Sequence, residues 1–408
     1  TEFIKKIKEP REINTQLVKA QLLRRISDRW VGFKLSEEIQ KYFQNLNLSA
    51  GRVQTPVLGW ILEKEKKIKQ KHYLINVGLQ EKNLYFYSED EKLIKNLKEK
   101  FKNKELEVEI EISQLREETI NPLPPYDTSN LLKDANNFFR FDAQTTMKLA
   151  QDLFEQGLIT YHRTDSVFIS EFGRNVAYEY LERKNLINLI YKRSWGEAGT
   201  HEGIRPTKPL DIQDLIESLV FEPKNLTKKH LQLYGLIFNR FLSSQTKVSI
   251  GEKARIKIKL HSLIKESEEF IRIIEENHLK FFRNIRIVDL KQGKFLVETL
   301  KIKKVPKEYH YLQGDIIDLM KQKGLGRPST YSNIIQTLIE RKYVLSRSGY
   351  LIPTSWGEKI YKYLIKKYKE LVSEDFTIKL EEEMDLVAEN KKDYQKILDK
   401  TFKHIFKK

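Results

Sequence analysis

A dense run of reactive side chains lies between Gly157 and Ser166, where the sequence reads GLITYHRTDS. A tyrosine hydroxyl can attack phosphorus or carbon and form a covalent intermediate, but its ordinary pKa of about 10 means that it needs a nearby base or cation. Arg163 is such a cation, and its guanidinium could bind phosphoryl oxygens in a transition state. The alternative is a buried Tyr161 with a satisfied hydroxyl beside an Asp–Arg surface pair, and residue types alone favour that structural interpretation.

A second polar segment reads WGEAGTHEGIRPT from Trp195 to Thr207. His201 and Arg205 are four residues apart, and the preceding glycines would let a phosphate or a reacting oxygen approach the backbone. Arg205 precedes a proline, which favours an extended backbone. A lone histidine is more often structural than catalytic. The chain has no His-Glu-x-x-His, no cysteine and no Asp-x-Asp, which argues against a self-contained metal site.

Two Gly-Arg turns lead into expected helices, SAGRVQTP at 49–56 and GLGRPSTY at 324–331. Backbone N–H groups, a helix N-terminus and a guanidinium converge in such a turn, and this geometry binds phosphate. The first turn is neither a Walker loop, since no Gly-Lys-Ser/Thr follows, nor a Gly-x-Gly-x-x-Gly fingerprint. A plain turn with a capped helix is the alternative for each.

The composition favours a polyanionic partner. The 408 residues, enough for two or three domains, contain 74 Lys and Arg against 57 Asp and Glu, a net charge of +17. A charge-rich thermophile surface is the alternative, but a balanced ion-pair network would lie near neutrality. The absence of cysteine excludes disulfides and zinc ribbons, and no apolar run approaches the ~18 residues of a membrane span. We therefore expect an intracellular, cytoplasmic protein.

Hydrophobic periodicity predicts helices at both ends of the chain and between two groups of strands. Helices are expected over 14–43 and 56–69, and strands within 73–112, 254–260, 281–288 and 295–300. The predicted fold is multidomain α+β, mainly α with a β-rich arch. The predicted domains are a helical, winged-helix-like DNA-binding domain of 1–70 plus 306–408, an arch of 71–120 plus 248–305, and a helical insertion of 121–247.

Local signals place the motifs on these elements. In the insertion, Thr128 or Ser129 is expected to cap one helix and Gly157 to end the next, while a third helix starts near Lys228. In the last hundred residues, a helix capped by Ser329 or Thr330 is followed by a hairpin and another helix, which is a winged-helix pattern. Many such units only pack, so DNA contact is not implied by the pattern alone.

Taken together, the motifs resemble those of type IA DNA topoisomerases, over nearly the whole chain. Six blocks agree in order and approximate spacing, and 376–384 resembles a further block. The six blocks are LLRRISDRWVG at 22–32, LSAGRVQ at 48–54, PPYDTS at 124–129, LITYHRTDS at 158–166, THEGIRPT at 200–207 and GRPSTY at 326–331.

The resemblance implies a toroidal architecture whose arch swings a tyrosine domain aside for strand passage. It implies that Tyr161 attacks a phosphodiester of single-stranded DNA and holds the 5′ phosphate, that Arg163 stabilises that phosphate and that His201 assists. It also implies contacts to DNA from nine residues: Arg25, Asp28, Arg52, Gln54, Arg205, Arg327, Ser329, Thr330 and Tyr331.

Within this family the chain looks most like the topoisomerase part of reverse gyrase from a hyperthermophile. That resemblance implies positive supercoiling with a helicase-like partner, through which alone ATP would act. The family's Toprim domain, which supplies Mg²⁺ ligands and a general acid, is expected to be missing here, so a Toprim-containing polypeptide or N-terminal part is the expected partner. The alternatives are a plain archaeal type IA topoisomerase fragment, a non-catalytic gate module that binds single-stranded DNA, and a winged-helix transcription factor.

Overall fold

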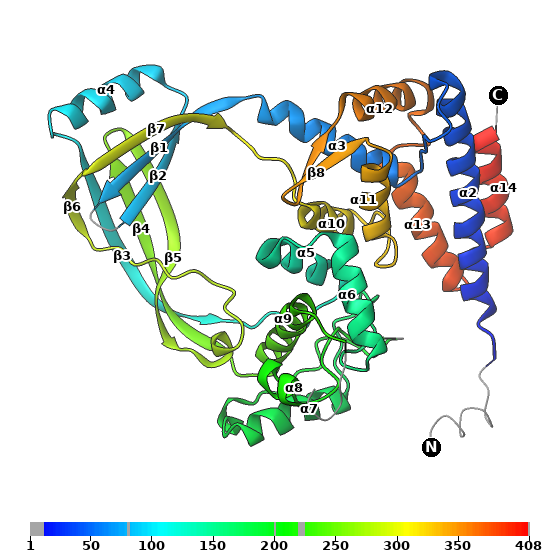
Figure 1. Cartoon of the computed structure of the whole chain (residues 1–408), viewed down its shortest axis with the longest axis horizontal. Helices are drawn as coiled ribbons and strands as arrows, with labels where there is room; N and C mark the ends of the chain where they lie inside the picture. Colours follow the sequence, from blue (N-terminus) through cyan, green and yellow to red (C-terminus); the bar gives the residue numbers. More distant parts are fainter. Residues whose placement is uncertain (1–11, 80–81, 200, 219–224, 407–408) are drawn as a thin grey trace. The chain divides into compact units, whose positions relative to one another are not determined.

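The computed structural model describes residues 12–79, 82–199, 201–218 and 225–406. These form two compact units, the first of Thr1–Glu63 with Tyr311–Lys408 and the second of Lys64–His310. Helices and antiparallel sheets are both present (Figure 1), which confirms the α+β prediction. The finer division into three domains stays a prediction. None of the described helices is long and apolar enough to cross a membrane.

The first unit is mainly helical. Its long helix α2 is capped by Asn14, whose side chain accepts a hydrogen bond from the Leu17 amide at 3.0 Å. Buried apolar residues of α2 pack against α13 and α14. The elements are α2 (Thr15–Phe43), α3 (Gln54–Ile68), α10 (Gln313–Gln322), α11 (Tyr331–Glu340), β8 (Val344–Arg347), β9 (Tyr350–Pro353), α12 (Ser355–Tyr368), α13 (Glu374–Ala388) and α14 (Tyr394–Phe406).

The winged-helix pattern predicted for the C-terminal part is confirmed. Helix α11 is followed by the β8–β9 hairpin, whose two-residue turn has positive φ at Ser348 and Gly349. Thr354 then caps α12 by accepting a hydrogen bond from the Gly357 amide at 3.0 Å. Thr330 is the N-cap residue of α11, but its hydroxyl bonds the Arg327 backbone instead of the helix.

The second unit contains two antiparallel sheets, of strand order β2-β1-β7 and β5-β4-β3-β6. Strands from two distant segments pair in both sheets, β1 with β7 and β3 with β4. Their apolar faces share one core with α4 (Glu91–Lys102). The strands are β1 (Lys71–Leu79), β2 (Lys82–Ser88), β3 (Glu107–Ile120), β4 (Ser249–Leu260), β5 (Leu263–Glu275), β6 (Gly293–Leu296) and β7 (Thr299–Pro306).

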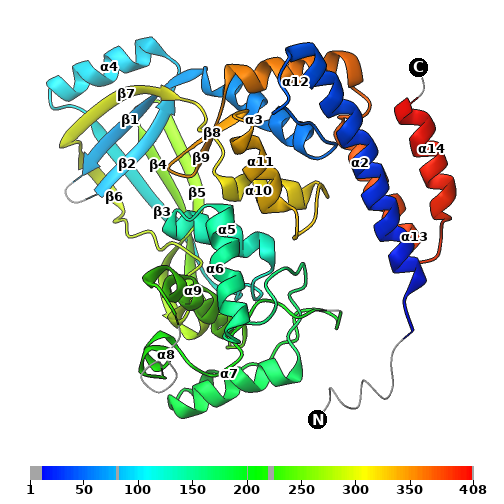
Figure 2. The ribbon, with the colours of Figure 1, turned by 45° about the vertical axis from the view of Figure 1, so that its right-hand side comes forward.

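Helices of the same unit enclose a second core. The aromatic side chains of Tyr234, Phe238 and Phe241 on α9 lie in its middle, and α9 packs against α5 and α6 (Figure 2). Gly157, with φ of +68°, follows α6 as expected. The helices are α5 (Thr128–Phe139), α6 (Ala143–Glu155), α7 (Glu171–Arg183), η1 (Ile187–Leu189), α8 (Ile212–Ser218), α9 (Lys228–Ser244) and η2 (Asn277–Lys280).

The structure corrects several local predictions. Residues 281–288 form no strand apart from a single bridge at Ile287, because Phe281 and Phe282 pack on the helical core while Val288 packs on the sheet core. The strand expected over 295–300 is divided between β6 and β7. Within 73–112, α4 interrupts the strands.

The predicted cap of α5 was also wrong. Asp127 is the N-cap, and its carboxylate accepts a hydrogen bond from the Asn130 amide at 2.8 Å. The Thr128 hydroxyl is occupied elsewhere, as described below.

Gly357 in α12 tests the packing of the winged helix. A Cβ at this position would lie 2.3 Å from the Tyr343 carbonyl oxygen, which is backbone and cannot rotate away. We expect Gly357→Ala to destabilise the first unit by about 1–3 kcal/mol, the typical cost of overpacking. Gly51→Ala, whose Cβ would meet nothing within 4 Å, should leave the midpoint of thermal unfolding unchanged. Equal midpoints for the two variants would contradict this packing.

Candidate active site

Tyr161 follows α6 in the second unit and is half-buried. Its ring contacts three neighbouring rings, with centroid distances of 5.4 Å to Phe154, 5.6 Å to His162 and 4.8 Å to His201. The structure thus brings together Tyr161 and His201, which are forty residues apart in the sequence. Arg163 is exposed and has no ion pair with any residue that the structure describes. Thr200, which precedes His201, lies outside the described residues.

The segment after Tyr161 is held by the hydroxyl of Thr128, at the start of α5. This buried hydroxyl lies 2.7 Å from the carbonyl oxygen of His162 and 2.9 Å from that of Thr164, and it accepts the Thr164 amide at 2.9 Å. The backbones of Thr128 and Thr164 also bond, at 2.9 Å. Because unpaired buried backbone groups are costly, these bonds fix the path of the segment.

The segment before Tyr161 is held by a second threonine, Thr160. Its hydroxyl donates to the Gly203 carbonyl oxygen at 2.8 Å and accepts the Arg205 amide at 3.0 Å. The Thr160 amide in turn donates to the Arg205 carbonyl oxygen at 2.9 Å. The Tyr161 segment and the segment that follows His201 therefore form one hydrogen-bonded unit.

The Arg205 side chain stabilises the segment that follows His201. Its guanidinium is buried, with Nε 2.5 Å from a Glu202 carboxylate oxygen and Nη1 2.9 Å from the Pro206 carbonyl oxygen. These contacts hold the extended backbone that the sequence predicted before Pro206. A contact of Arg205 with DNA stays a prediction.

His162 is fully buried beside the nucleophile candidate. Neither imidazole nitrogen has a hydrogen-bond partner among the described residues. Burial, reinforced by the charge of Arg163, lowers the pKa of His162 to about 4. The ring is therefore uncharged at neutral pH and packs as an apolar group against Phe154 and Tyr161.

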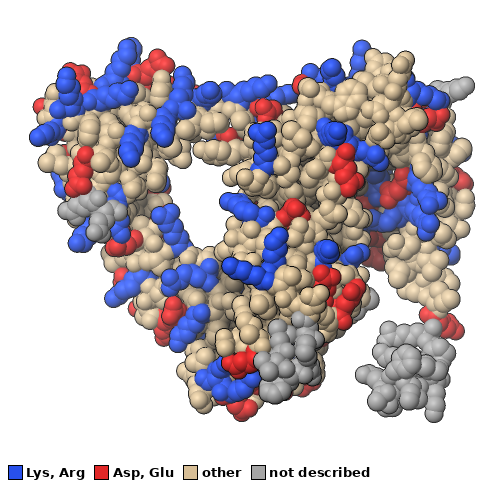
Figure 3. Space-filling model, viewed as in Figure 1, with Lys and Arg blue, Asp and Glu red and all other residues tan. Residues whose placement is uncertain are grey.

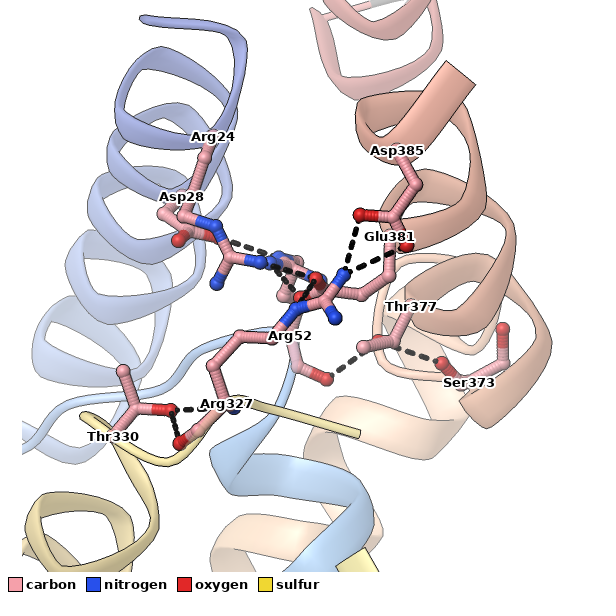
Figure 4. A network of polar contacts seen from close by, with 9 residues as sticks. All are labelled: Arg24, Asp28, Arg52, Arg327, Thr330, Ser373, Thr377, Glu381 and Asp385. Atoms are coloured by element: carbon pink, nitrogen blue, oxygen red, sulfur yellow. Dashed lines mark hydrogen bonds and ion pairs between the residues drawn. The ribbon is translucent and has the colours of Figure 1, made fainter. Parts of the chain in front are cut away.

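In the first unit, three of the predicted DNA-binding residues lie in one ionic network (Figure 4). Arg52 is at its centre, with only 2% of its side chain exposed. It pairs with Asp28 and, at 2.7 Å, with Glu381. Burial alone would lower the pKa of Arg52, but the two carboxylates outweigh burial and raise the pKa. Arg24 also pairs with Glu381.

Arg327 joins the same network from the turn before α11. Its Nε is 3.1 Å from Glu381 and its Nη2 is 2.8 Å and 2.9 Å from the two Asp385 oxygens. The Thr330 hydroxyl fixes the turn by accepting the Arg327 amide at 3.0 Å. The two Gly-Arg turns predicted from the sequence therefore meet on one carboxylate of α13.

The other predicted DNA-binding residues of this unit differ in exposure. Arg25 and Ser329 are exposed, Tyr331 is buried, and Gln54 donates to the Ser49 carbonyl oxygen at 3.3 Å. Sequence reasoning missed Arg24, Glu381 and Asp385 as parts of the site. The 376–384 block contains Glu381, but nothing in its spacing distinguishes that carboxylate from the neighbouring Glu382 and Glu383.

Figure 3 shows Lys and Arg side chains over both units on the face in view, with Asp and Glu between them. Among the described residues, no group of three or more His, Cys, Asp or Glu side chains could hold a metal ion.

The buried His162 predicts a pH dependence of stability. Its pKa is lower in the folded state than the ordinary 6.5, so protonation favours unfolding, and stability is lost as the pH falls from about 6.5 toward 4. Relative to a His162→Met variant, we expect the native protein to lose about 2 kcal/mol between pH 7 and pH 5. Urea unfolding of the second unit at both pH values measures this. A constant difference between the two proteins would contradict a neutral buried imidazole.

We expect the stability of the first unit to depend strongly on the negative charge of Glu381. Glu381→Gln leaves Arg52 buried with Asp28 as its remaining carboxylate partner, which should cost about 3–5 kcal/mol. Asp385→Asn is the matched control, since Asp385 is 61% exposed and its pair with Arg327 should contribute at most about 1 kcal/mol. Calorimetric unfolding compares the two. Similar losses in both variants would show that the buried pair is not what holds this unit.

Comparisons with known proteins identify the family of this chain. A family model described as DNA topoisomerase matches residues 12–399. Reverse gyrase 1 of Aquifex aeolicus is 44% identical over 98% of this chain and 35% of its own length, and reverse gyrase of Pyrococcus furiosus is 42% identical over 99% of this chain and 33% of its own length. The chain thus spans about a third of the length of these relatives.

A solved structure shows the same fold. Full-length topoisomerase I from Thermotoga maritima matches with a TM-score of 0.77 and 29% identity, over 98% of this chain and 69% of that protein. The expected topoisomerase fold is confirmed by this match. The chain belongs to the type IA DNA topoisomerase family.

Proposed function

We propose that this chain is the nucleophile-bearing part of a type IA DNA topoisomerase. The observation that carries the proposal is the half-exposed Tyr161 beside His201, on a segment held on both sides by threonine hydroxyls. The Tyr161 oxygen attacks the phosphorus of a single-stranded DNA phosphodiester. The phenol O–H bond breaks and its proton leaves as the O–P bond forms, the bond from phosphorus to the 3′ oxygen breaks, and that oxygen takes up one proton, so the step consumes no net proton. Reversal of the step religates the strand, so ATP is not needed for it.

Two side chains of this segment support the attack. The guanidinium of Arg163, which has no ion pair with any described residue, binds the phosphoryl oxygens as negative charge develops on them. His201, whose ring contacts that of Tyr161, orients the tyrosine and the phosphate. His162 acts only through packing, because its ring is buried and neutral.

The first unit binds the single strand in this proposal. Arg25, Ser329 and the edge of the Arg327 turn are accessible to phosphates. Arg52 has a different role, since its guanidinium is buried against Asp28 and Glu381. It positions the turn and the helices that carry the accessible groups.

The relatives are about three times as long as this chain, which suggests that further regions take part in the complete supercoiling reaction. We propose that the chain works with a Toprim region, which would supply a general acid and Mg²⁺ ligands, and with a helicase-like region that uses ATP. Such an assembly would introduce positive supercoils, as the name reverse gyrase of the relatives suggests. A plain type IA topoisomerase and a non-catalytic gate module are the alternatives.

Formation of a covalent adduct tests the proposal. The chain is mixed with labelled single-stranded DNA and Mg²⁺, with and without a separately made Toprim-containing fragment of a relative. We expect a denaturant-resistant adduct only with the fragment, and none with Tyr161→Phe. Tyr178→Phe, which removes a hydroxyl bonded to Glu182 on α7, should form the adduct as the native chain does.

Binding of the same DNA separates the alternatives. Salt-sensitive binding of single strands without any adduct in the presence of the fragment would leave the gate module. Equal affinity for duplex and single strands across a salt titration would contradict the single-strand proposal.

A further inference from the structure

A hollow between α13 and α14 lies outside the residues that the proposed function uses. It has a volume of about 640 Å³, within the range of pockets that hold a ligand of drug size, and is therefore large enough for one nucleoside. Phe376, Leu380 and His404 lie on its apolar side, where the Phe376 and His404 rings stack at 5.5 Å and 22°. Both helices pack against α2 (Figure 1).

The spacing of residues on α13 shows that this hollow is distinct from the arginine network. Thr377, Glu381 and Asp385 are four residues apart and face the network. The pocket residues of α13 occupy another stripe with spacings of three and four, namely Phe376, Lys379, Leu380 and Glu383. One helix thus presents one face to the network and another to the hollow.

The rim of the hollow is basic. Lys379 on α13 and Lys396, Lys400 and Lys403 on α14 line it. Lys400 is 3.5 Å from Glu383, whereas the other three have no ion pair with any described residue. Four lysines against the two carboxylates Glu383 and Asp399 leave an excess of positive charge around an apolar floor.

We propose that this hollow binds a single-stranded DNA segment, with one base against the Phe376–His404 pair and the neighbouring phosphates on the rim lysines. Aromatic stacking combined with lysines along a groove is the usual means of holding single strands without sequence preference. An acidic peptide would use the lysines but not the stacked floor. The inference rests on the proposed function, and it adds a DNA contact away from Tyr161.

The test compares two pairs of neutralising substitutions in the Tyr161→Phe background. Lys396→Gln with Lys403→Gln removes two rim charges, and Lys95→Gln with Lys98→Gln removes two exposed charges of α4 as the matched control. Fluorescence anisotropy of a short labelled oligothymidine is measured across a salt series. The rim pair should make the slope of log K against log salt shallower by about 1.4 and weaken binding roughly 25-fold at 0.1 M salt. The α4 pair should change neither.

A photo-cross-link tests the base contact. In the unsubstituted Tyr161→Phe protein, an oligomer containing 5-bromouracil should cross-link to peptides of α13 or α14, and His404→Ala should reduce that yield. Equal slopes for both lysine pairs, with cross-links confined to other peptides, would overturn this site while leaving the proposed function standing. Failure of the Tyr161→Phe protein to bind any single strand would contradict both.

Discussion

The bonds of the Thr128 hydroxyl are the constraint on which the candidate active site depends. One buried hydroxyl accepts the amide of Thr164 and lies within hydrogen-bond distance of the carbonyl oxygens of His162 and Thr164, to one of which it donates its single hydrogen, so the segment has one well-bonded path. Thr160 does the same on the other side of Tyr161, against the backbone of 203–205. The tyrosine itself stays half-exposed between these fixed points. A nucleophile needs this combination of a rigid backbone and an accessible oxygen.

In the first unit, buried ion pairs rather than threonine hydroxyls fix the positions of the chain segments. Glu381 accepts ion pairs from Arg24, Arg52 and Arg327, which come from α2 and from the two turns before α3 and α11. A carboxylate with so little exposure is stable only while its cations are present, and Arg52 has the same requirement. These ion pairs therefore connect four chain segments: α2, the turn before α3, the turn before α11, and α13. Removal of Glu381 or Arg52 alone would leave its partner as a buried, unpaired charge.

The sequence predicted the elements better than the contacts between them. The periodicity of α2, α6 and α9 and the winged-helix pattern were correct because each depends on local spacing. The strand expected over 281–288 was wrong because its apolar residues belong to two different cores, which no local pattern shows. The family resemblance implied that Tyr161 and His201 share one site, and their rings are indeed 4.8 Å apart, but nothing in the sequence indicated that Arg52 and Arg205 are buried. Burial of a charged residue depends on distant carboxylates such as Glu381, and spacing along the chain does not encode them.

The central claim is that the Tyr161 hydroxyl is the nucleophile of the covalent step. The hydrogen bonds of Thr128 and Thr160 fix the backbone that carries it. The most direct measurement is mass spectrometry of peptides from a trapped protein–DNA adduct, which locates the nucleotide on the chain. The account predicts a single modified peptide, with the nucleotide joined through phosphate to the Tyr161 oxygen. A nucleotide attached to any other residue would contradict it.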